Sequence, residues 1–396
     1  MNHPNPVRPS FTQCGLVILF LLFAVTRAFS GATATSPAVD WNVAVLDQVI
    51  AGVPAGEKYA RIDDMLVPVD YLQYWRSYLA GGPQPNSAFA SGFTMWPSGN
   101  VYYAFDASVT AANQKVFLDS AAEWATFANL HFMARSTQAD YILVTNNASL
   151  SGGLSVVGKG GGAQLLQIGP TSWVHGVVVH EIGHALGLVH EHQRSDRDNY
   201  VTINSNNVAA GQLQNFVLLT TSQNKGPYDF LSVMHYYHNA FSVNTALDTI
   251  VPHSTNSQYL NIMGQRFDPV LSTNDRAGMI SIYGAGPGAS SVVTNTADSG
   301  PGTLRAALYY AYDHYGTTIT FNIPNTDSGF SNNVFNILPS DALPSLVNAT
   351  ILDGTSEPVK ANANGPQILI NGVSCRAPIL FVNGLQFKGT NCAARG

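Results

Sequence analysis

The chain has 396 residues, of which 45% are hydrophobic and only 11% are charged, and its formal net charge is -6. This composition excludes a disordered chain, and the length allows two or three domains with a sizeable core. The slight acidity, without a run rich in Lys and Arg, argues against a nucleic-acid partner.

The first residues are predicted to form a signal peptide. Gly15–Val25 is an apolar run of eleven residues, which is too short to span a bilayer. Arg8 precedes the run and small residues follow it, so we place the signal peptide at residues 1–34, with cleavage near Ala34; cleavage after Ser30 is the alternative. The chain is therefore expected to be secreted and extracellular, with no stable membrane span after signal removal.

Residues 35–89 are interpreted as a propeptide. Two amphipathic stretches, Trp41–Ile50 and Tyr71–Leu79, predict helices, and a linker rich in Gly, Pro, Asn and Ser runs from Gly81 to Ser91. Such linkers are easily cut by proteases, so we expect the activating cleavage there.

The next region alternates strand and helix patterns. Val101–Phe105 and Tyr141–Val144 are predicted strands, and Thr110–Ala128 has the spacing of a helix with one apolar face. Gly162–Gly169 is predicted to be a further strand, and at a sheet edge its backbone groups would pair with an extended peptide. A helix is expected to begin near Ser172.

That helix leads into His-Glu-Ile-Gly-His-Ala-Leu-Gly-Leu-Val-His-Glu at residues 180–191. His180 and His184 are four residues apart, so their imidazoles project from one face of a helix. His190 would point to nearly the opposite face of a continuous helix, so the helix must end at Gly187, the residue type that most readily takes the left-handed conformation. The three histidines predict a site for one catalytic zinc ion; a solvated polar stripe is the alternative.

Glu181 directly follows the first histidine and is placed to reach a water molecule at the metal. Zinc lowers the pKa of such a water from ~15.7 to about 7, and Glu181 would accept its proton as a general base. The pattern therefore predicts metal-assisted hydrolysis.

Residues 180–200 resemble the extended signature of the astacin family of metzincin zinc metallopeptidases, in which an acidic residue, here Glu191, follows the third histidine. Residues 228–236 resemble the Met-turn of that family. The resemblance implies that Met234 lies beneath the metal and that Tyr236 is a fifth metal ligand that also stabilises the oxyanion.

The resemblance covers Ala90–Gly284 and implies an α+β peptidase domain, placed at residues 90–286, with two lobes. A twisted, mostly parallel sheet and the zinc helix would form the upper lobe, and the lower lobe would be irregular. Family members usually carry two disulfides in this domain, and none is expected here. The resemblance also implies that Glu191 pairs with the new amino terminus after propeptide removal; an ion pair with Arg194 or Arg197 is the alternative.

Two aspartates of the predicted propeptide and three further histidines are also candidates for roles near the zinc site. Asp64 of the propeptide is predicted to present its carboxylate to the zinc and displace the water, with Asp63 as the weaker candidate; an acidic surface turn is the alternative for either residue. Three histidines suffice for catalytic zinc, so His192, His235 and His238 are expected to support the ligands or lie at the surface.

Residues 287–396, the C-terminal region, contain short β-like runs separated by turns. Val293–Arg305 resembles the opening segment of secreted right-handed parallel β-helix domains of bacterial surface proteins, of which only the first coils would fit. The role of this region stays open: it could be a binding accessory that contacts a surface or polysaccharide, a cap, or the remnant of a longer domain. Cys375 and Cys392 would be free to form one disulfide in an oxidising compartment.

The sequence thus predicts a secreted zinc endopeptidase, made as a latent precursor, that hydrolyses protein or peptide substrates through a zinc-bound water activated by Glu181. The alternative is a surface adhesion or binding protein that uses the C-terminal region, with the zinc domain as a scaffold. The intact ligand set and Glu181 argue against that alternative.

Overall fold

The computed structural model describes residues 37–82, 94–219, 224–264, 271–340, 342–363, 365–374 and 385–395. The predicted signal peptide, most of the predicted activation linker and Cys375 lie outside these residues, so the predictions made for them are not tested. Among the described residues, no helix combines the length and the apolar character needed to cross a membrane.

The amino-terminal segment, residues 37–82, folds into two helices and a hairpin. Helices α1 (Pro37–Ala51) and α2 (Val69–Leu79) confirm the two predicted amphipathic helices. Between them, β1 (Tyr59–Ile62) and β2 (Met65–Pro68) pair in antiparallel fashion. Buried side chains of all four elements form one core with residues 217–219, so the segment is packed against the rest of the chain.

A seven-stranded sheet, with the order β1-β2-β6-β7-β5-β3-β4, joins the amino-terminal segment to the following domain. Most of its strand pairs are parallel, while β6 is antiparallel to β7 and β1 to β2. Strand β7 does not lie at the sheet edge, because β6 forms a further strand beyond it and β2 pairs with β6 in turn. The strands of this domain are β3 (Asn100–Phe105), β4 (His131–Ala134), β5 (Tyr141–Asn146), β6 (Gly153–Val156) and β7 (Ala163–Ile168).

Helices α4 (Ala111–Phe127), α5 (His175–Ala185) and α6 (Thr273–Tyr283) contribute to one apolar core with the alternate buried side chains of the sheet. The indole of Trp124 donates a hydrogen bond of 3.0 Å to the carbonyl of Val179 and so fixes α5 against α4. Helix α5 begins three residues later than expected, because the backbone of Val174 is still extended.

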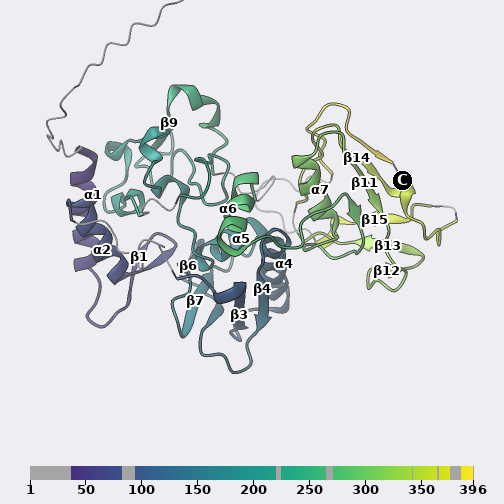
Figure 1. The fold of residues 1–396 in the computed structure, drawn as a ribbon, viewed down its shortest axis with the longest axis horizontal. Coiled ribbons are helices and arrows are strands. Elements are labelled where there is room, and N and C mark those ends of the chain that lie inside the picture. The colour runs from purple at the N-terminus through teal and green to yellow at the C-terminus, as the bar shows by residue number, and fades with distance from the viewer. Residues whose placement is uncertain are drawn as a thin grey trace, which may run out of the picture. The chain divides into compact units, whose positions relative to one another are not determined.

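The lower lobe is irregular, as expected. Its one pair of strands among the described residues is β8 (Val201–Ile203) with β9 (Ile250–Pro252), and short 3-10 turns make up much of the rest. Figure 1 shows the lobe around β9 and the sheet lobe on either side of α5. The predicted α+β architecture is confirmed.

The C-terminal region has one helix, α7 (Leu304–Asp313), and two small sheets among its described residues. Most of the strand pairs are parallel, and the resemblance to a β-helix stays a prediction. The first sheet contains β10 (Val292–Val293), β11 (Thr318–Phe321), β14 (Ile351–Asp353) and β16 (Ala393–Arg395); the second contains β12 (Phe330–Ser331), β13 (Val334–Ile337) and β15 (Ile368–Ile370).

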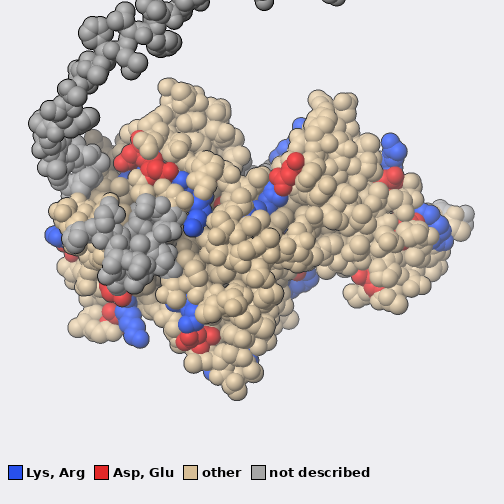
Figure 2. Space-filling model, viewed as in Figure 1, with Lys and Arg blue, Asp and Glu red and all other residues tan. Residues whose placement is uncertain are grey.

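Charged side chains are sparse on the molecular face drawn in Figure 2. Lys and Arg stand there singly or beside Asp and Glu, and they do not gather into one basic patch. This face therefore lacks the electrostatic footprint that nucleic-acid binding requires.

Candidate active site

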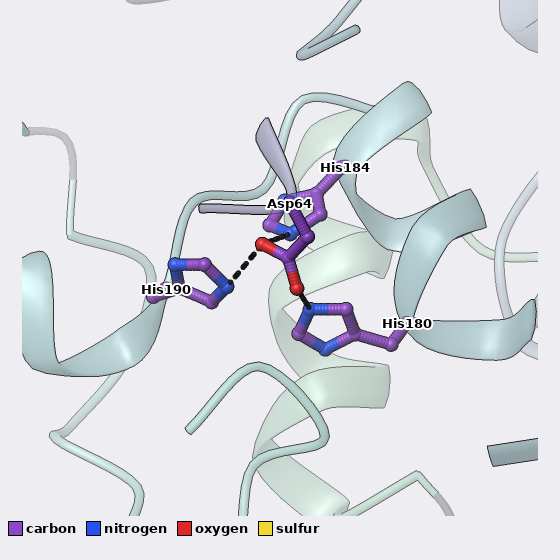
Figure 3. A group of neighbouring side chains, drawn as sticks. All are labelled: Asp64, His180, His184 and His190. Atoms are coloured by element: carbon purple, nitrogen blue, oxygen red, sulfur yellow. Dashed lines mark ion pairs between the residues drawn. The ribbon is translucent and has the colours of Figure 1, made fainter. Parts of the chain in front are cut away.

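The three predicted histidines converge with one carboxylate (Figure 3). His180 and His184 project from one face of α5, and His190 comes from the chain beyond Gly187, whose φ of 105° ends the helix as predicted. The Nε2 atoms of His180, His184 and His190 lie 3.2, 3.4 and 3.0 Å from oxygens of Asp64. All three imidazoles are fully buried.

The histidine rings are oriented for metal binding by their other nitrogens. Each ring has its Nδ1 beside an acceptor oxygen: His180 beside the Val233 carbonyl at 2.7 Å, His184 beside the Leu188 carbonyl at 2.8 Å, and His190 beside Oε1 of Gln193 at 3.1 Å. A hydrogen on Nδ1 leaves the lone pair on Nε2, which is the tautomer that binds a metal. Three such nitrogens are a donor set that suits catalytic zinc.

The carboxylate of Asp64 completes this cation site. Burial alone raises the pKa of Asp64, but the electrostatic effect of His190 and the close contacts with the three imidazoles hold that pKa well below its usual range. Asp64 is therefore ionised, and its oxygens face the same centre as the three Nε2 atoms. The four groups fit one divalent cation.

Glu181 is buried beside the cluster, next to a cavity of about 300 Å³. The cavity is also lined by Leu150 and Val177, and the amino-terminal segment contributes Asp63 and Asp64 to its wall. The start of β6 passes so close that a Cβ on Gly153 would lie 2.1 Å from Oε1 of Glu181. Only glycine at this position leaves room for the observed carboxylate.

Met234 packs directly against α5. A Cβ on Gly183, between the first two histidines, would lie 2.8 Å from the sulfur of Met234. The turn is held by Asp275, which accepts hydrogen bonds from the Ser232 hydroxyl at 2.6 Å and from the Val233 amide at 2.9 Å. The methionine thus lies against the helix that carries two of the histidines.

Tyr236 connects the cluster with the amino-terminal segment. Its buried ring lies 4.4 Å from the ring of His190, centroid to centroid, and its hydroxyl donates a hydrogen bond to the carboxylate of Asp63. Asp63 has a left-handed backbone, with a φ of 55°, which Asp tolerates better than most residues. Sequence reasoning ranked Asp63 below Asp64, whereas both carboxylates reach the site.

Glu191 is partly buried and forms the ion pair with Arg194 that was one of its two expected roles. Its Oε1 accepts hydrogen bonds from Arg194 at 3.1 Å and from the Asp229 amide at 2.8 Å. Burial raises the pKa of Glu191, and the charge of Arg194 and the hydrogen bond from the Asp229 amide oppose this shift. Arg197 instead donates to backbone carbonyls and to Asp198. Pairing with a new amino terminus stays a prediction.

The three remaining nearby histidines lie outside the cluster. His192 and His235 are buried, and each contacts a backbone carbonyl. Nε2 of His192 lies 2.9 Å from the Asn215 carbonyl, and Nδ1 of His235 lies 2.7 Å from the Tyr236 carbonyl. His238 pairs with Asp248 at 2.6 Å. Burial lowers the pKa of His235 to about 4, so this ring is neutral.

Comparisons with known proteins point to one family. The model of the Astacin peptidase family matches residues 89–284. The chain is 36% identical to human Tolloid-like protein 1 over 203 residues, which are 50% of this chain and 20% of that protein. It is 32% identical to mouse Astacin-like metalloendopeptidase over 208 residues, which are 51% of this chain and 46% of that protein. It thus spans about a fifth of the length of Tolloid-like protein 1.

A solved structure is similar as well. High choriolytic enzyme 1, a hatching enzyme zinc-protease from the medaka fish Oryzias latipes, aligns with a TM-score of 0.45 and 28% identity over 50% of this chain and 98% of that one. The family match ends at residue 284, so it lends no support to the β-helix resemblance of the C-terminal region. Residues 89–284 therefore form a domain of the astacin family of peptidases.

Proposed function

We propose that the chain is a secreted endopeptidase, made as a latent precursor, that cleaves protein or peptide substrates with Glu181 as its proton-transfer group. The observation that carries this proposal is the convergence of three Nε2 atoms beside the buried Glu181. A predicted signal peptide supports secretion.

His180, His184 and His190 would hold the zinc ion through Nε2. When bound, zinc supplies a Lewis acid that polarises the substrate carbonyl and makes water a nucleophile near neutral pH. Glu181 accepts a proton from the attacking water and then delivers it to the amine of the leaving peptide, so the carboxylate returns to its starting state. The hydroxyl of Tyr236, once released from Asp63, is placed to donate a hydrogen bond to the oxyanion.

Strand β6 is the proposed docking strand for an extended substrate. In the precursor, β2 pairs with β6, and the amides of Ser155 and Val157 donate to the carbonyls of Asp64 and Leu66 at 2.8 and 3.1 Å. A substrate that pairs with the same side of β6 needs these backbone groups. Strand β2 must therefore leave before a substrate docks.

Latency is proposed to rest on three contacts of one segment. Asp64 faces the same centre as the three histidines and blocks it from solvent and substrate, Asp63 holds the Tyr236 hydroxyl, and β2 covers β6. Residues 35–89 would thus act as the propeptide. Cleavage in the linker and loss of this segment would expose the histidines, Tyr236 and β6 together.

The proposal is tested by cleavage of an unstructured protein, with zinc content measured on the same samples. We expect the processed wild type to hold one zinc ion and to lose cleavage in a chelator. Glu181→Gln should keep the zinc and lose cleavage, since only the proton acceptor is removed. Near-normal turnover of Glu181→Gln would refute this mechanism, and wild type that holds zinc without cleavage would favour the binding-protein alternative.

A further inference from the structure

We propose that the C-terminal region is a fixed structural part of the peptidase unit, in which α7 docks on α4 and α6 and Tyr309, through Glu123 of α4, acts as a positioning residue for the zinc helix. The strand-rich region beyond α7 would then be carried rigidly by the peptidase. This inference goes beyond the proposed function and does not rest on it.

The connection between the two regions is bonded to the peptidase domain. The amides of Gly286 and Gly288 donate hydrogen bonds of 2.7 Å to the carbonyls of Phe127 and Thr126, at the end of α4. A Cβ on Gly286 would lie 2.5 Å from the carbonyl oxygen of Ala128, so the close approach requires glycine. The chain is therefore tied to α4 along this stretch.

An ion pair between buried Arg276 and partly exposed Asp313 ties α6 to the end of α7. Arg276 donates two hydrogen bonds to the carboxylate of Asp313, at 2.8 and 3.1 Å, and its guanidinium lies 4.9 Å from the ring centre of Phe127 and 5.2 Å from that of Tyr309. Arg276 is only 4% exposed. A two-point pair between planar groups fixes the orientation of α7 as well as its distance.

Tyr309 enters the core of the peptidase domain from α7. Its side chain is fully buried, its ring packs edge-on against Phe127, and its hydroxyl accepts a hydrogen bond of 3.2 Å from the Leu271 amide. The same hydroxyl donates to Oε1 of Glu123, in the middle of α4. A residue of the C-terminal region thus satisfies a buried carboxylate of the peptidase domain.

The second carboxylate oxygen of Glu123 contacts the zinc helix. Oε2 pairs with Nε2 of His175, which is the first residue of α5 and lies five residues before His180. Nδ1 of His175 lies 3.3 Å from the hydroxyl of Ser120, and that hydroxyl donates its own hydrogen to the Val116 carbonyl. Both ring nitrogens therefore have acceptors, which suits the imidazolium form.

A cation at the start of a helix is unfavourable, because the helix dipole is positive there. Glu123 compensates for this charge. Burial alone raises the pKa of Glu123, but the charges of His175 and Arg305, together with the hydrogen bonds from His175 and Tyr309, bring that pKa below its usual value, so the group is ionised. Two of these contributors, Arg305 and Tyr309, belong to α7.

The trio of Ser120, His175 and Glu123 has the composition of a hydrolase triad, but its position excludes that role. None of the three side chains is more than 2% exposed, so no substrate reaches the hydroxyl. The network instead links α7, α4 and α5 through hydrogen bonds between buried groups. Without the Tyr309 hydroxyl, the carboxylate of Glu123 loses one hydrogen-bond donor. The contact of Glu123 with His175, at the start of the zinc helix, is then weakened.

Tryptophan fluorescence of the full chain tests the docking. All five tryptophans lie between residues 41 and 173, so this signal reports on unfolding outside the C-terminal region. We expect Tyr309→Phe to lower the tryptophan-monitored melting temperature by about 3 to 8 °C, the cost of an incompletely satisfied buried carboxylate. The matched control is Tyr310→Phe, because the ring of Tyr310 stacks on His314 within the C-terminal region and should leave the temperature unchanged.

Asp313→Asn provides a second variant at a partly exposed position, should Tyr309→Phe fail to fold. It should also lower the tryptophan-monitored melting temperature. If the foldable variants melt at the same temperature as Tyr310→Phe, the C-terminal region is an independent domain and the docking proposal is overturned.

Hydrogen exchange separates positioning from general destabilisation. In Tyr309→Phe, exchange should speed up at the amides of residues 175–185 by several-fold and stay unchanged in the paired strands β8 and β9. Uniform acceleration, or none at α5, would overturn the positioning role. Neither readout uses peptidase activity, so failure of this inference leaves the proposed function untouched.

Discussion

The hydroxyl of Tyr236 donates a hydrogen bond to Asp63, a residue whose φ of 55° places its backbone in the left-handed region. Two neighbouring carboxylates of one turn therefore contact two different parts of the site, Asp63 at the tyrosine and Asp64 at the histidines. This division of contacts allows their contributions to latency to be measured separately.

The first prediction concerns these two residues. Asp64→Ala should raise cleavage by the intact precursor, because the hairpin loses its contact with the histidine centre and β2 releases β6 more often. Asp63→Gly on that background should raise it further, by roughly tenfold, since one hydrogen bond to a charged group is worth about 1.5–3 kcal/mol and glycine takes the left-handed backbone without strain. Cleavage rates are compared on precursor shown to be unprocessed, with the exposed Glu57→Ala as control.

Two outcomes would count against this prediction. An Asp64→Ala precursor as inactive as wild type would remove the latency role of Asp64. An unchanged rate on adding Asp63→Gly would show that the contact with Tyr236 contributes nothing.

The second prediction uses the glycines at the start of β6. Gly153→Ala would place a Cβ 2.1 Å from Oε1 of Glu181, so the catalytic carboxylate must move. Turnover by the processed enzyme should fall by at least about tenfold, within the range that general-base catalysis contributes, while zinc content stays normal. Gly152→Ala is the matched control, since a Cβ there meets nothing within 4 Å. Equal turnover of the two variants would contradict the close packing of Glu181 on β6.

The third prediction concerns Tyr236. Tyr236→Phe should lower kcat of the processed enzyme by up to about 100-fold, because one donor to the oxyanion is lost while the proton acceptor remains. The loss should be smaller than that of Glu181→Gln, with little change in KM. A change confined to KM would show that the hydroxyl acts in substrate binding and not on the oxyanion.

The fourth prediction concerns acid stability in the C-terminal region. Asp298 forms a buried ion pair with Arg305 at 2.8 Å. Burial alone raises the pKa of Asp298, but the charge of Arg305 and hydrogen bonds from Ser340 and Arg305 lower it well below 3.8. The unfolded chain therefore binds more protons than the folded chain between the two pKa values, and stability falls as the pH drops through that window.

Asp298→Asn should cost about 3–5 kcal/mol at pH 7, because Arg305 is left buried without its counter-charge. The difference from wild type should shrink below pH 3.8, where the wild type begins to lose the same pair. Urea unfolding followed by circular dichroism at pH 7 and pH 3 measures both values. A difference that is independent of pH would contradict the charge-based explanation.

The local chemistry of the site was predictable because it depends on short sequence spacings. His180 and His184 follow from helical periodicity, and the helix end at Gly187 follows from the need to turn His190 back. Glu181 is fixed by its position next to the first histidine. The two amino-terminal helices were equally predictable, since their apolar periodicity is local.

Contacts between distant segments were not predictable from spacing. The sequence left open which strand lies at the edge of the sheet, because nothing in the four residues 153–156 shows that they pair beyond β7. The pairing of Asp63 with Tyr236 joins residues 173 positions apart, and that of Glu123 with Tyr309 joins residues 186 apart. Such pairs depend on how whole elements pack, and a single sequence holds no direct signal for them.

The amino-terminal segment is held by much more than the linker that follows it. Its hairpin, α1 and α2 share a buried core with residues 217–219, and the side chains of Tyr71 and Trp75 donate to the carbonyls of Leu219 and Leu218. Cutting the linker breaks none of these contacts. The cleaved segment would then be a separate molecule in equilibrium with the enzyme, so the active fraction would rise on dilution and fall when the free segment is added back.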